Sequence, residues 1–543
     1  MISINSSDSE TKKALNWLNS VDPALKLGSS SDAVKTKLAV EKFSTMKHSY
    51  ILCFGALNDM SLAYLSKLGN DHLYGIDSTS KVYDMPYYTQ IKYTPSPLDN
   101  THFPECFFDA LYSTNPSKLP SNVEGVKAFL DEAKRITSNG SALFFPLEYA
   151  SRNNWKLFGN SGFSQQEIGE ILRHAEKIGF KQAQKADFPD HDCILFFEFR
   201  LSKKVKINAI KQINIIVPSL GTGEGIDLHA RNMKTRLAKL GIKANLYKGY
   251  DNADKKYITV IEYVPAFKLQ FPKKGRYVID CCQTQAQVRF WLEVSNILRG
   301  ILRNPADFFR VMKVILFHFN YSVQTVQRLK TDQNKELAKH FLICRSNELA
   351  EASGFKNYTL MELPSFGEPV KHKKTPKELN LGSFGFATKS KNFDLICELA
   401  KRLGIKATIW MGASRMDNAS KKGMNYIAQN IYNRYNSDRI QVRLGGYTEE
   451  QLIKGMRNCT HFISAQSEAM TASGSLRHMV KLGRSAISVN NYIARDAQVH
   501  RVKSLNEIDR EYLERTTELT NLDDGLRYLI KILEHLDFSK DFK

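Results

Sequence analysis

The chain of 543 residues is too long for a single hydrophobic core, and its 42% hydrophobic and 24% charged residues exclude a fibrous or wholly disordered protein. Its apolar runs fall short of the ~20 residues that cross a bilayer. The N-terminus lacks the basic start and apolar core of a secretory signal, so we expect a cytoplasmic protein. The net charge is +21, and residues 201–380 hold 31 Lys and Arg against 15 Asp and Glu. A field of that sign attracts anionic lipid surfaces, phosphorylated acceptors or nucleic acid.

The pattern along the chain predicts an α/β protein with three Rossmann-like lobes. We expect a polar N-terminal extension at residues 1–45, a first lobe at 46–203, a basic second lobe at 209–375, a third lobe at 376–522 and a C-terminal helix at 523–543. The eight cysteines are scattered without a Cys-x-x-Cys pair or nearby histidines at zinc spacing. We therefore expect reduced thiols and no metal site.

The first lobe opens with a strand, helix and strand in succession. The buried run SYILCFG is followed by a helical pattern that ends at Gly69 and by the run HLYGID, which ends at Asp77. In such a unit the first loop approaches a nucleoside, and an acid at the end of the second strand accepts hydrogen bonds from ribose hydroxyls. Asp77 has that position, and Asp99 follows farther on. Each acid is equally consistent with an ordinary loop cap or a solvated charge.

Over residues 46–200 this order of elements resembles the class I SAM-dependent methyltransferases. The resemblance implies SAM as a cofactor, with Gly55 beside it, Asp77 holding the ribose and Asp99 beside the adenine. The first loop departs from the family pattern where an acid and two glycines are expected: it has Cys53, Leu57 and Asp59. Two alternatives follow, an active methyltransferase and a related fold that serves only as a scaffold.

The second lobe begins with the strand INIIVPSL, a glycine-rich turn and a long helical pattern. Gly221, Gly223 and Gly225 allow backbone amides and a helix start to approach an anionic group, so the turn can bind phosphate or an acceptor. A tight turn without a ligand is the alternative. Farther on, residues 289–330 interleave aromatic and basic side chains. Helices of this kind lie on an anionic membrane surface or pack into a core with their arginines extended to water.

The third lobe repeats the strand, loop and helix pattern several times. The strand at LNLGSFGF is followed by a loop with Lys389 and Lys391, a helix, and a strand that ends at Gly412. Next come a strand, a Gly-Gly turn that Thr448 caps, a helix and a further strand. The chain then passes through a loop and a helix into another strand. The alternation predicts a parallel sheet with helices on both faces.

Over residues 211–522 the chain resembles the retaining GT-B glycosyltransferases of family 4. The resemblance implies that Lys391, or Lys389 beside it, neutralises the donor diphosphate and acts in catalysis together with Glu468. A lysine and a helix N-terminus supply this charge without a metal. The family's paired glutamates are not kept, since Arg477 or His478 stands near the second position. The implied donor site consists of Gly223, Gly385, Gly412, Gly446, Tyr447, Ser473, Gly474, Ser475 and Arg477.

These patterns together predict a glycosyltransferase that moves a sugar from a nucleotide-sugar donor to a glycan or a lipid-phosphate-linked acceptor. The basic second lobe favours an anionic acceptor and a peripheral position on the inner face of a membrane, as in polysaccharide biosynthesis. Methylation of the same glycan by the first lobe is an additional expectation. The alternatives are a glycosyltransferase that acts on modified nucleic acid, and a non-catalytic scaffold that binds nucleotides or carbohydrates.

Overall fold

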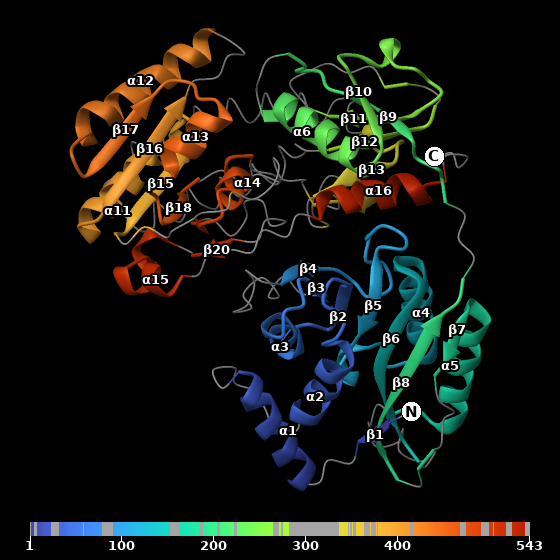
Figure 1. Cartoon of the computed structure of the whole chain (residues 1–543). Helices are drawn as coiled ribbons and strands as arrows, with labels where there is room; N and C mark the ends of the chain where they lie inside the picture. The colour runs from blue at the N-terminus through green and yellow to red at the C-terminus, as the bar shows by residue number, and fades with distance from the viewer. Residues whose placement is uncertain are drawn as a thin grey trace. The chain divides into compact units, whose positions relative to one another are not determined.

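The computed structural model of the chain divides into two units, each described by itself (Figure 1). Unit 1 comprises Met1–Ala209 and Arg527–Leu536, and unit 2 comprises Ile210–Leu526 and Asp537–Lys543. The structure describes residues 2–4, 8–22, 32–57, 59–78, 91–151, 162–183, 188–189, 191–203, 207–221, 225–263, 271–272, 275–281, 336–345, 347, 350, 354–362, 370, 376, 378–412, 418–466, 474–489, 499–502, 504–516 and 524–537.

Unit 1 is built on an eight-stranded sheet in the order β1-β8-β6-β5-β2-β3-β4, with β7 also pairing with β8. The strands from β2 to β6 run parallel, and β8 is antiparallel to its neighbours. This arrangement is the class I methyltransferase-like fold expected from the sequence. The strands are β1 (Ile2–Ile4), β2 (Tyr50–Phe54), β3 (His72–Asp77), β4 (Lys92–Pro95), β5 (Phe108–Tyr112), β6 (Thr137–Tyr149), β7 (Phe180–Gln182) and β8 (Cys193–Leu201).

Helices cover both faces of this sheet because its strands carry apolar side chains on both sides. On one face Ile51 and Cys53 of β2 share a core with α1, α2 and α3, so the polar N-terminal segment contributes buried residues to unit 1. On the other face Phe54 packs edge-on against Phe129 of α4, with ring centroids 4.8 Å apart. The helices are α1 (Asp8–Val21), α2 (Asp32–Phe43), α3 (Ser61–Lys67), η2 (Pro116–Lys118), α4 (Val123–Ile136) and α5 (Gln165–Ile178).

The last helix of the chain, α16 (Gly525–His535), returns to unit 1. The guanidinium of Arg527 lies 3.6 Å from the centroid of the Tyr50 ring and donates a hydrogen bond of 2.6 Å to the Phe107 carbonyl. Tyr528 packs on the Phe107 ring at 4.2 Å. Unit 1 is therefore completed by a segment that follows all of unit 2 in the sequence.

Unit 2 contains two separate parallel sheets. The first has the order β10-β9-β11-β12-β13-β14. Its strands are short and mostly buried, because a parallel sheet is covered on both faces. Asp280 at the end of β12 accepts two hydrogen bonds from the Arg345 guanidinium, at 2.6 and 2.7 Å. The elements are β9 (Gln212–Ile216), α6 (Gly225–Lys239), β10 (Lys243–Tyr247), η4 (Tyr250–Asn252), β11 (Ile258–Glu262), β12 (Tyr277–Asp280), β13 (Leu342–Cys344) and β14 (Tyr358–Leu360).

The second sheet of unit 2 has the order β17-β16-β15-β18-β19-β20, which is the 3-2-1-4-5-6 order of the Rossmann fold. All of its strand pairs are parallel. The strands are β15 (Asn380–Phe386), β16 (Lys406–Gly412), β17 (Ile440–Leu444), β18 (His461–Ser464), β19 (Ser485–Ser488) and β20 (His500–Arg501). The helices are η6 (Lys389–Lys391), α11 (Phe393–Leu403), α12 (Asn418–Tyr435), α13 (Glu449–Met456), α14 (Gly474–Lys481), η7 (Leu505–Glu507) and α15 (Arg510–Arg515).

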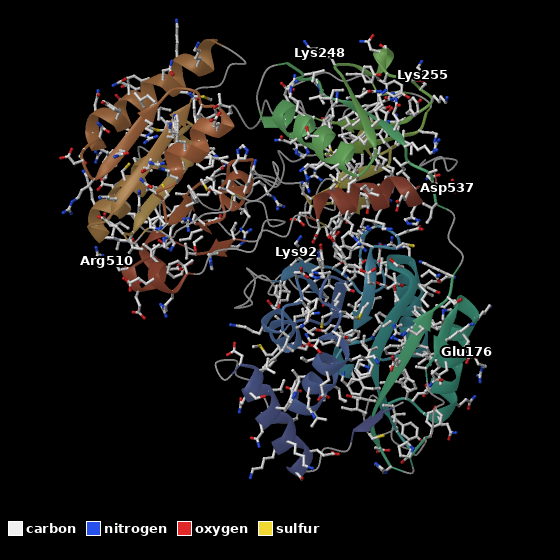
Figure 2. The ribbon with its side chains drawn as sticks, in the orientation of Figure 1. Lys92, Glu176, Lys248, Lys255, Arg510 and Asp537 are labelled. Carbon is white, nitrogen blue, oxygen red and sulfur yellow. The ribbon has the colours of Figure 1, made fainter. Side chains whose placement is uncertain are left out.

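Three α/β sheets confirm the predicted fold class, with the sheets held in two units. Figure 2 shows the side chains of the described residues, among them the exposed Lys248 and Lys255 of the basic second lobe. The aromatic and basic segment at 289–330 lies outside the described residues. Among the helices that the structure describes, none has both the length and the hydropathy that a bilayer crossing requires.

Candidate functional site

The switch point of the Rossmann-order sheet lies between β15 and β18, where successive connections leave in opposite directions. In open parallel sheets a ligand binds outside the carboxyl ends of the strands at such a point. Gly385 lies near the end of β15, Lys391 ends the η6 turn that follows it, and Gln466 comes two residues after β18. The fold therefore brings these three residues to one edge of the sheet.

Lys391 is the central side chain of this edge. Its Nζ donates hydrogen bonds to Gln466 Oε1 at 2.7 Å and to Ser475 Oγ, on the first turn of α14, at 2.9 Å. Both of these partners are uncharged, so neither of them neutralises the ammonium. A phosphate oxygen that replaced either partner would gain a charge-assisted hydrogen bond.

The backbone around Lys391 is fixed by two unusual conformations. Asn392 is left-handed at φ 49° and begins α11, and its side-chain amide donates to the Ala465 carbonyl at 2.7 Å. Gly385 has φ 144°, and a Cβ at this position would lie 3.7 Å from Lys391 Cε and 3.9 Å from Ser475 Cβ. The predicted residues Gly385, Lys391 and Ser475 are thus neighbours, although they are far apart in the sequence.

A second group of predicted residues lies at the ends of β16 and β17. The Gly445 amide donates to the Met411 carbonyl at 2.9 Å, and a Cβ at Gly412 would lie 3.6 Å from the Gly445 carbonyl oxygen. The same Cβ would lie 4.0 Å from the Cα of Gly446, which is exposed. Without side chains at these positions, two strand ends present bare backbone at the carboxyl edge of the sheet.

Tyr447 follows these glycines and packs on aromatic neighbours. Its ring lies 5.2 Å from that of Trp410 and 6.1 Å from that of Phe384. Burial raises the pKa of the Tyr447 phenol far above its ordinary value, so the side chain is neutral at physiological pH. Thr448 then caps α13 in a capping box with Gln451. Tyr447 offers an aromatic surface and a hydroxyl rather than a charge.

Other predicted residues have different positions. Arg477 is 3% exposed and forms an ion pair of 2.8 Å with Glu362, which is 5% exposed and follows β14. It therefore anchors α14 by a buried ion pair. Lys389 is exposed, and Gly474 begins α14. Three predicted residues lie outside the described residues: Gly223, Glu468 and Ser473.

The sequence analysis did not identify Gln466, which is 2% exposed and holds Lys391. Its position two residues after a buried strand at the switch point is the signal that could have found it. A polar side chain at the carboxyl end of a central strand is a candidate for ligand contact even when no motif names it. Gln466 belongs to the candidate site because it sets the position of the Lys391 ammonium.

In unit 1 the predicted cofactor residues lie around the switch point between β2 and β5. Gly55 follows β2 with φ 67°, Asp77 ends β3 and is 3% exposed, and Asp99 is exposed. Asp77 Oδ2 lies 3.3 Å from the Lys118 ammonium and accepts a hydrogen bond of 3.3 Å from the Leu57 amide. Asp77, whose carboxylate was expected to hold the ribose, therefore has partners within the protein.

The loop after β2 is tied down by the buried Asp59, which stands where a glycine was expected. Its carboxylate accepts hydrogen bonds from Ser61 Oγ and Thr114 Oγ1, both at 2.5 Å, and from the Cys53 thiol at 3.4 Å. Burial and the nearby Asp59 charge raise the pKa of Cys53 well above its ordinary value, so the thiol stays protonated. The departures from the methyltransferase pattern thus form one internal network.

These contacts do not fit SAM, because Asp77 Oδ2 already has a cation and an amide as partners. We derive no methyl-transfer step from unit 1. Among the residues that the structure describes, no three His, Cys, Asp or Glu side chains form a group able to hold a metal ion.

No protein-family model and no curated protein matches the chain. Among solved structures, a Burkholderia thailandensis 1,6-didemethyltoxoflavin-N1-methyltransferase with bound S-adenosylhomocysteine is 12% identical over 37% of this chain and 94% of its own, with a TM-score of 0.25. A TehB-like SAM-dependent methyltransferase from Corynebacterium glutamicum is 16% identical over 36% and 98%, with a TM-score of 0.25. A TarM mutant of S. aureus, in complex with fondaparinux, α-GlcNAc-glycerol and UDP, is 13% identical over 55% and 54%, with a TM-score of 0.29. At these values the similarities establish no activity for this chain.

Proposed function

We propose that unit 2 is a glycosyltransferase of the GT-B type, which binds a nucleotide-sugar donor at the switch point between β15 and β18. The observation that carries the proposal is the Lys391 ammonium, held by Gln466 and Ser475 at the place where a sheet of this order binds a nucleotide. Two uncharged oxygen atoms, Gln466 Oε1 and Ser475 Oγ, help to fix the position of this cation.

Transfer of a sugar breaks the bond between its anomeric carbon and the donor phosphate, so negative charge develops on the leaving diphosphate. In this proposal Lys391 stabilises that charge, and the N-terminus of α14 adds the partial positive charge of its free amides. Both groups are in place before the reaction, which is the condition for effective electrostatic stabilisation. The acceptor hydroxyl then forms its bond to the anomeric carbon on the face from which the diphosphate leaves, and its proton passes to the leaving phosphate oxygen, so that the configuration is retained as the family resemblance implies.

The nucleoside of the donor lies, in this proposal, along the bare backbone of Gly412, Gly445 and Gly446. A base needs close approach to backbone amides and carbonyls, which side chains at these positions would prevent. Tyr447 lies at the same edge and supplies a neutral aromatic face. The identity of the base and of the sugar is open to a panel of donors.

The acceptor in this proposal is a glycan or a lipid-phosphate-linked sugar, and the enzyme works at the inner face of a membrane. Residues 201–380 hold 31 basic and 15 acidic residues, and this positive charge supports an acceptor that is anionic. Sedimentation with vesicles of anionic and of zwitterionic lipid tests this part. Equal binding to both, together with salt-sensitive binding to duplex DNA, would favour nucleic acid as the acceptor instead.

The decisive variant is Lys391→Met, which keeps the side-chain stem and removes the charge. We expect it to abolish the thermal shift that a nucleotide-sugar donor produces and to lower donor turnover by about 10²-fold, the usual effect of removing one preorganised charge-stabilising group. Lys406→Met is the matched control, because Lys406 begins β16 at the opposite edge and pairs with Glu378.

Lys389→Met distinguishes the two lysines of the loop. A loss in Lys389→Met with full binding in Lys391→Met would transfer the role to Lys389. If no donor among UDP-, GDP-, CMP- and dTDP-sugars binds the intact protein, the glycosyltransferase proposal fails and a scaffold without catalysis is favoured.

A further inference from the structure

In unit 1 a lysine of the same chain contacts two of the residues that were expected to lie beside a nucleoside, Gly55 and Asp77. Lys118 ends the η2 turn after β5, and Gly55 follows β2, so the two residues meet at the switch point of this sheet. A Cβ at Gly55 would lie 2.4 Å from Lys118 Cβ and 2.9 Å from its Cγ. The stem of Lys118 therefore lies directly over the first glycine of the loop.

The head of the same side chain reaches the acid at the end of β3. Lys118 Nζ lies 3.3 Å from Asp77 Oδ2, and the Leu57 amide donates to that same oxygen at 3.3 Å. Asp77 is 3% exposed, while the Lys118 side chain is 31% exposed. A ribose hydroxyl that approaches Asp77 Oδ2 has to compete with Lys118 for it, in an ion pair whose carboxylate is largely buried.

The turn that carries Lys118 is itself well determined. The Asn115 side chain accepts hydrogen bonds from the Ser117 amide at 3.0 Å and from Ser117 Oγ at 2.8 Å. Thr114, in the same segment, bonds to the buried Asp59 of the first loop. Internal hydrogen bonds thus fix both the turn that carries Lys118 and its connection to the first loop.

The positive charge of Lys118 disfavours SAM in addition to the space that its side chain occupies. SAM carries a sulfonium cation, and a lysine ammonium close to it would repel it. We propose that Lys118, which covers Gly55 and pairs with Asp77, sets the ligand specificity of this site and excludes SAM from unit 1. Unit 1 then keeps the methyltransferase-like fold without the cofactor. This inference is independent of the proposed function, which concerns unit 2.

The test uses two variants of the whole chain. Lys118→Met removes the charge, and Lys118→Ala also removes most of the side-chain stem. S-Adenosylhomocysteine and SAM are titrated calorimetrically into the wild-type protein, Lys118→Met and Lys118→Ala. We expect no measurable binding to the wild type and binding at least ~10-fold tighter in the variants, the difference that calorimetry resolves with ease. The gain for SAM exceeds that for S-adenosylhomocysteine, because only SAM carries the sulfonium charge.

Two further variants make the result specific. Lys118→Met combined with Asp77→Asn loses the gain, since an amide no longer accepts both ribose hydroxyls. Lys127→Met on α4, a surface lysine paired with Glu124, leaves binding as in the wild type. Circular dichroism verifies that each variant folds.

The inference is overturned if the wild type binds S-adenosylhomocysteine as tightly as Lys118→Met does. It is equally overturned if the folded Lys118→Met and Lys118→Ala proteins both fail to bind. The nucleotide-sugar shift of unit 2 is unchanged in all of these variants, so failure here is distinguishable from failure of the glycosyltransferase proposal.

Discussion

Gln466 shows how a single uncharged side chain controls the candidate site. It is 2% exposed, and its Oε1 accepts a hydrogen bond of 2.7 Å from Lys391. An amide at this position holds the lysine without neutralising it. A carboxylate in the same place would compete with the donor phosphate for the cation.

We therefore expect Gln466→Glu, which is almost isosteric, to weaken donor binding about tenfold or more. Gln466→Ala should weaken it less, because it removes one uncharged partner of the ammonium and adds no negative charge. Isothermal titration with the nucleotide-sugar donor gives the two dissociation constants. Gln441→Glu, on the exposed side of β17, is the control for an added surface charge. Equal affinity in Gln466→Glu and the wild type would contradict the role of Gln466.

His478, which also lies on α14, makes the stability of the protein depend on pH. Burial lowers the pKa of His478 from 6.5 to about 4 in the folded protein. The unfolded chain therefore binds more protons than the folded chain between these values. The contribution of the neutral His478 to the free energy of unfolding is therefore fully present above pH 6.5, and it is lost as the pH falls toward 4.

The expected loss from His478 is at most about 3 kcal/mol, since one pKa unit corresponds to about 1.4 kcal/mol. His478→Gln should flatten the fall in the free energy of unfolding between neutral pH and pH 4.5, as measured by urea denaturation. His48→Gln is the control, because the His48 side chain is 86% exposed. The same fall in His478→Gln as in the wild type would show that other groups cause it.

At the scale of elements, the sequence predicted most of the strands and helices that build the candidate site. The runs that became β15, β16 and β18 are short and apolar, and glycines, lysines or capping residues end them. Thr448 was expected to cap a helix and does so, with Gln451 as its capping-box partner. The family resemblance named Gly385, Lys391 and Ser475 as donor-site residues, and the parallel topology brings the end of β15, the η6 turn and the start of α14 together.

Contacts between distant elements could not be predicted in the same way. Nothing near Asp77 in the sequence indicates Lys118, which lies on a different loop 41 positions later and pairs with it through the fold. Arg477 and Glu362 are 115 positions apart, so the burial of Arg477 had no local signal. The Asp59 network likewise joins residues from the ends of β2 and β5. Each of these is a pairing of polar groups, and hydrophobic periodicity carries no information about such pairings.

At the scale of the whole molecule, unit 1 is discontinuous in the sequence. Its first segment ends at Ala209, unit 2 follows, and Arg527–Leu536 returns to unit 1. Asn208 joins the two segments, since its side-chain amide donates to the Leu533 carbonyl at 3.0 Å and to the Leu536 carbonyl at 3.1 Å. The C-terminal helix expected at 523–543 is thus a structural part of the methyltransferase-like unit.

Removal of residues 523–543 should therefore destabilise unit 1, although the cut lies at the end of unit 2 in the sequence. The truncation deletes the Arg527 guanidinium over Tyr50, its hydrogen bond to Phe107 and the Tyr528 ring, and it exposes the apolar surface beneath them. We expect limited proteolysis to cleave within residues 1–209 first. Truncation after Asp537 is the matched control, because it retains the whole of α16.

Arg527→Ala tests the contribution of the guanidinium apart from that of the rest of α16. It leaves the Phe107 carbonyl and the Asp109 carboxylate without this partner, and loss of the cation–π contact and of one charged hydrogen bond should cost about 1–3 kcal/mol.

Preferential early cleavage within unit 2 in the 523–543 truncation would show that α16 stabilises that unit instead. Since α16 follows residues 210–526 in the sequence, unit 1 can reach its full stability only after that part of unit 2 has been synthesised.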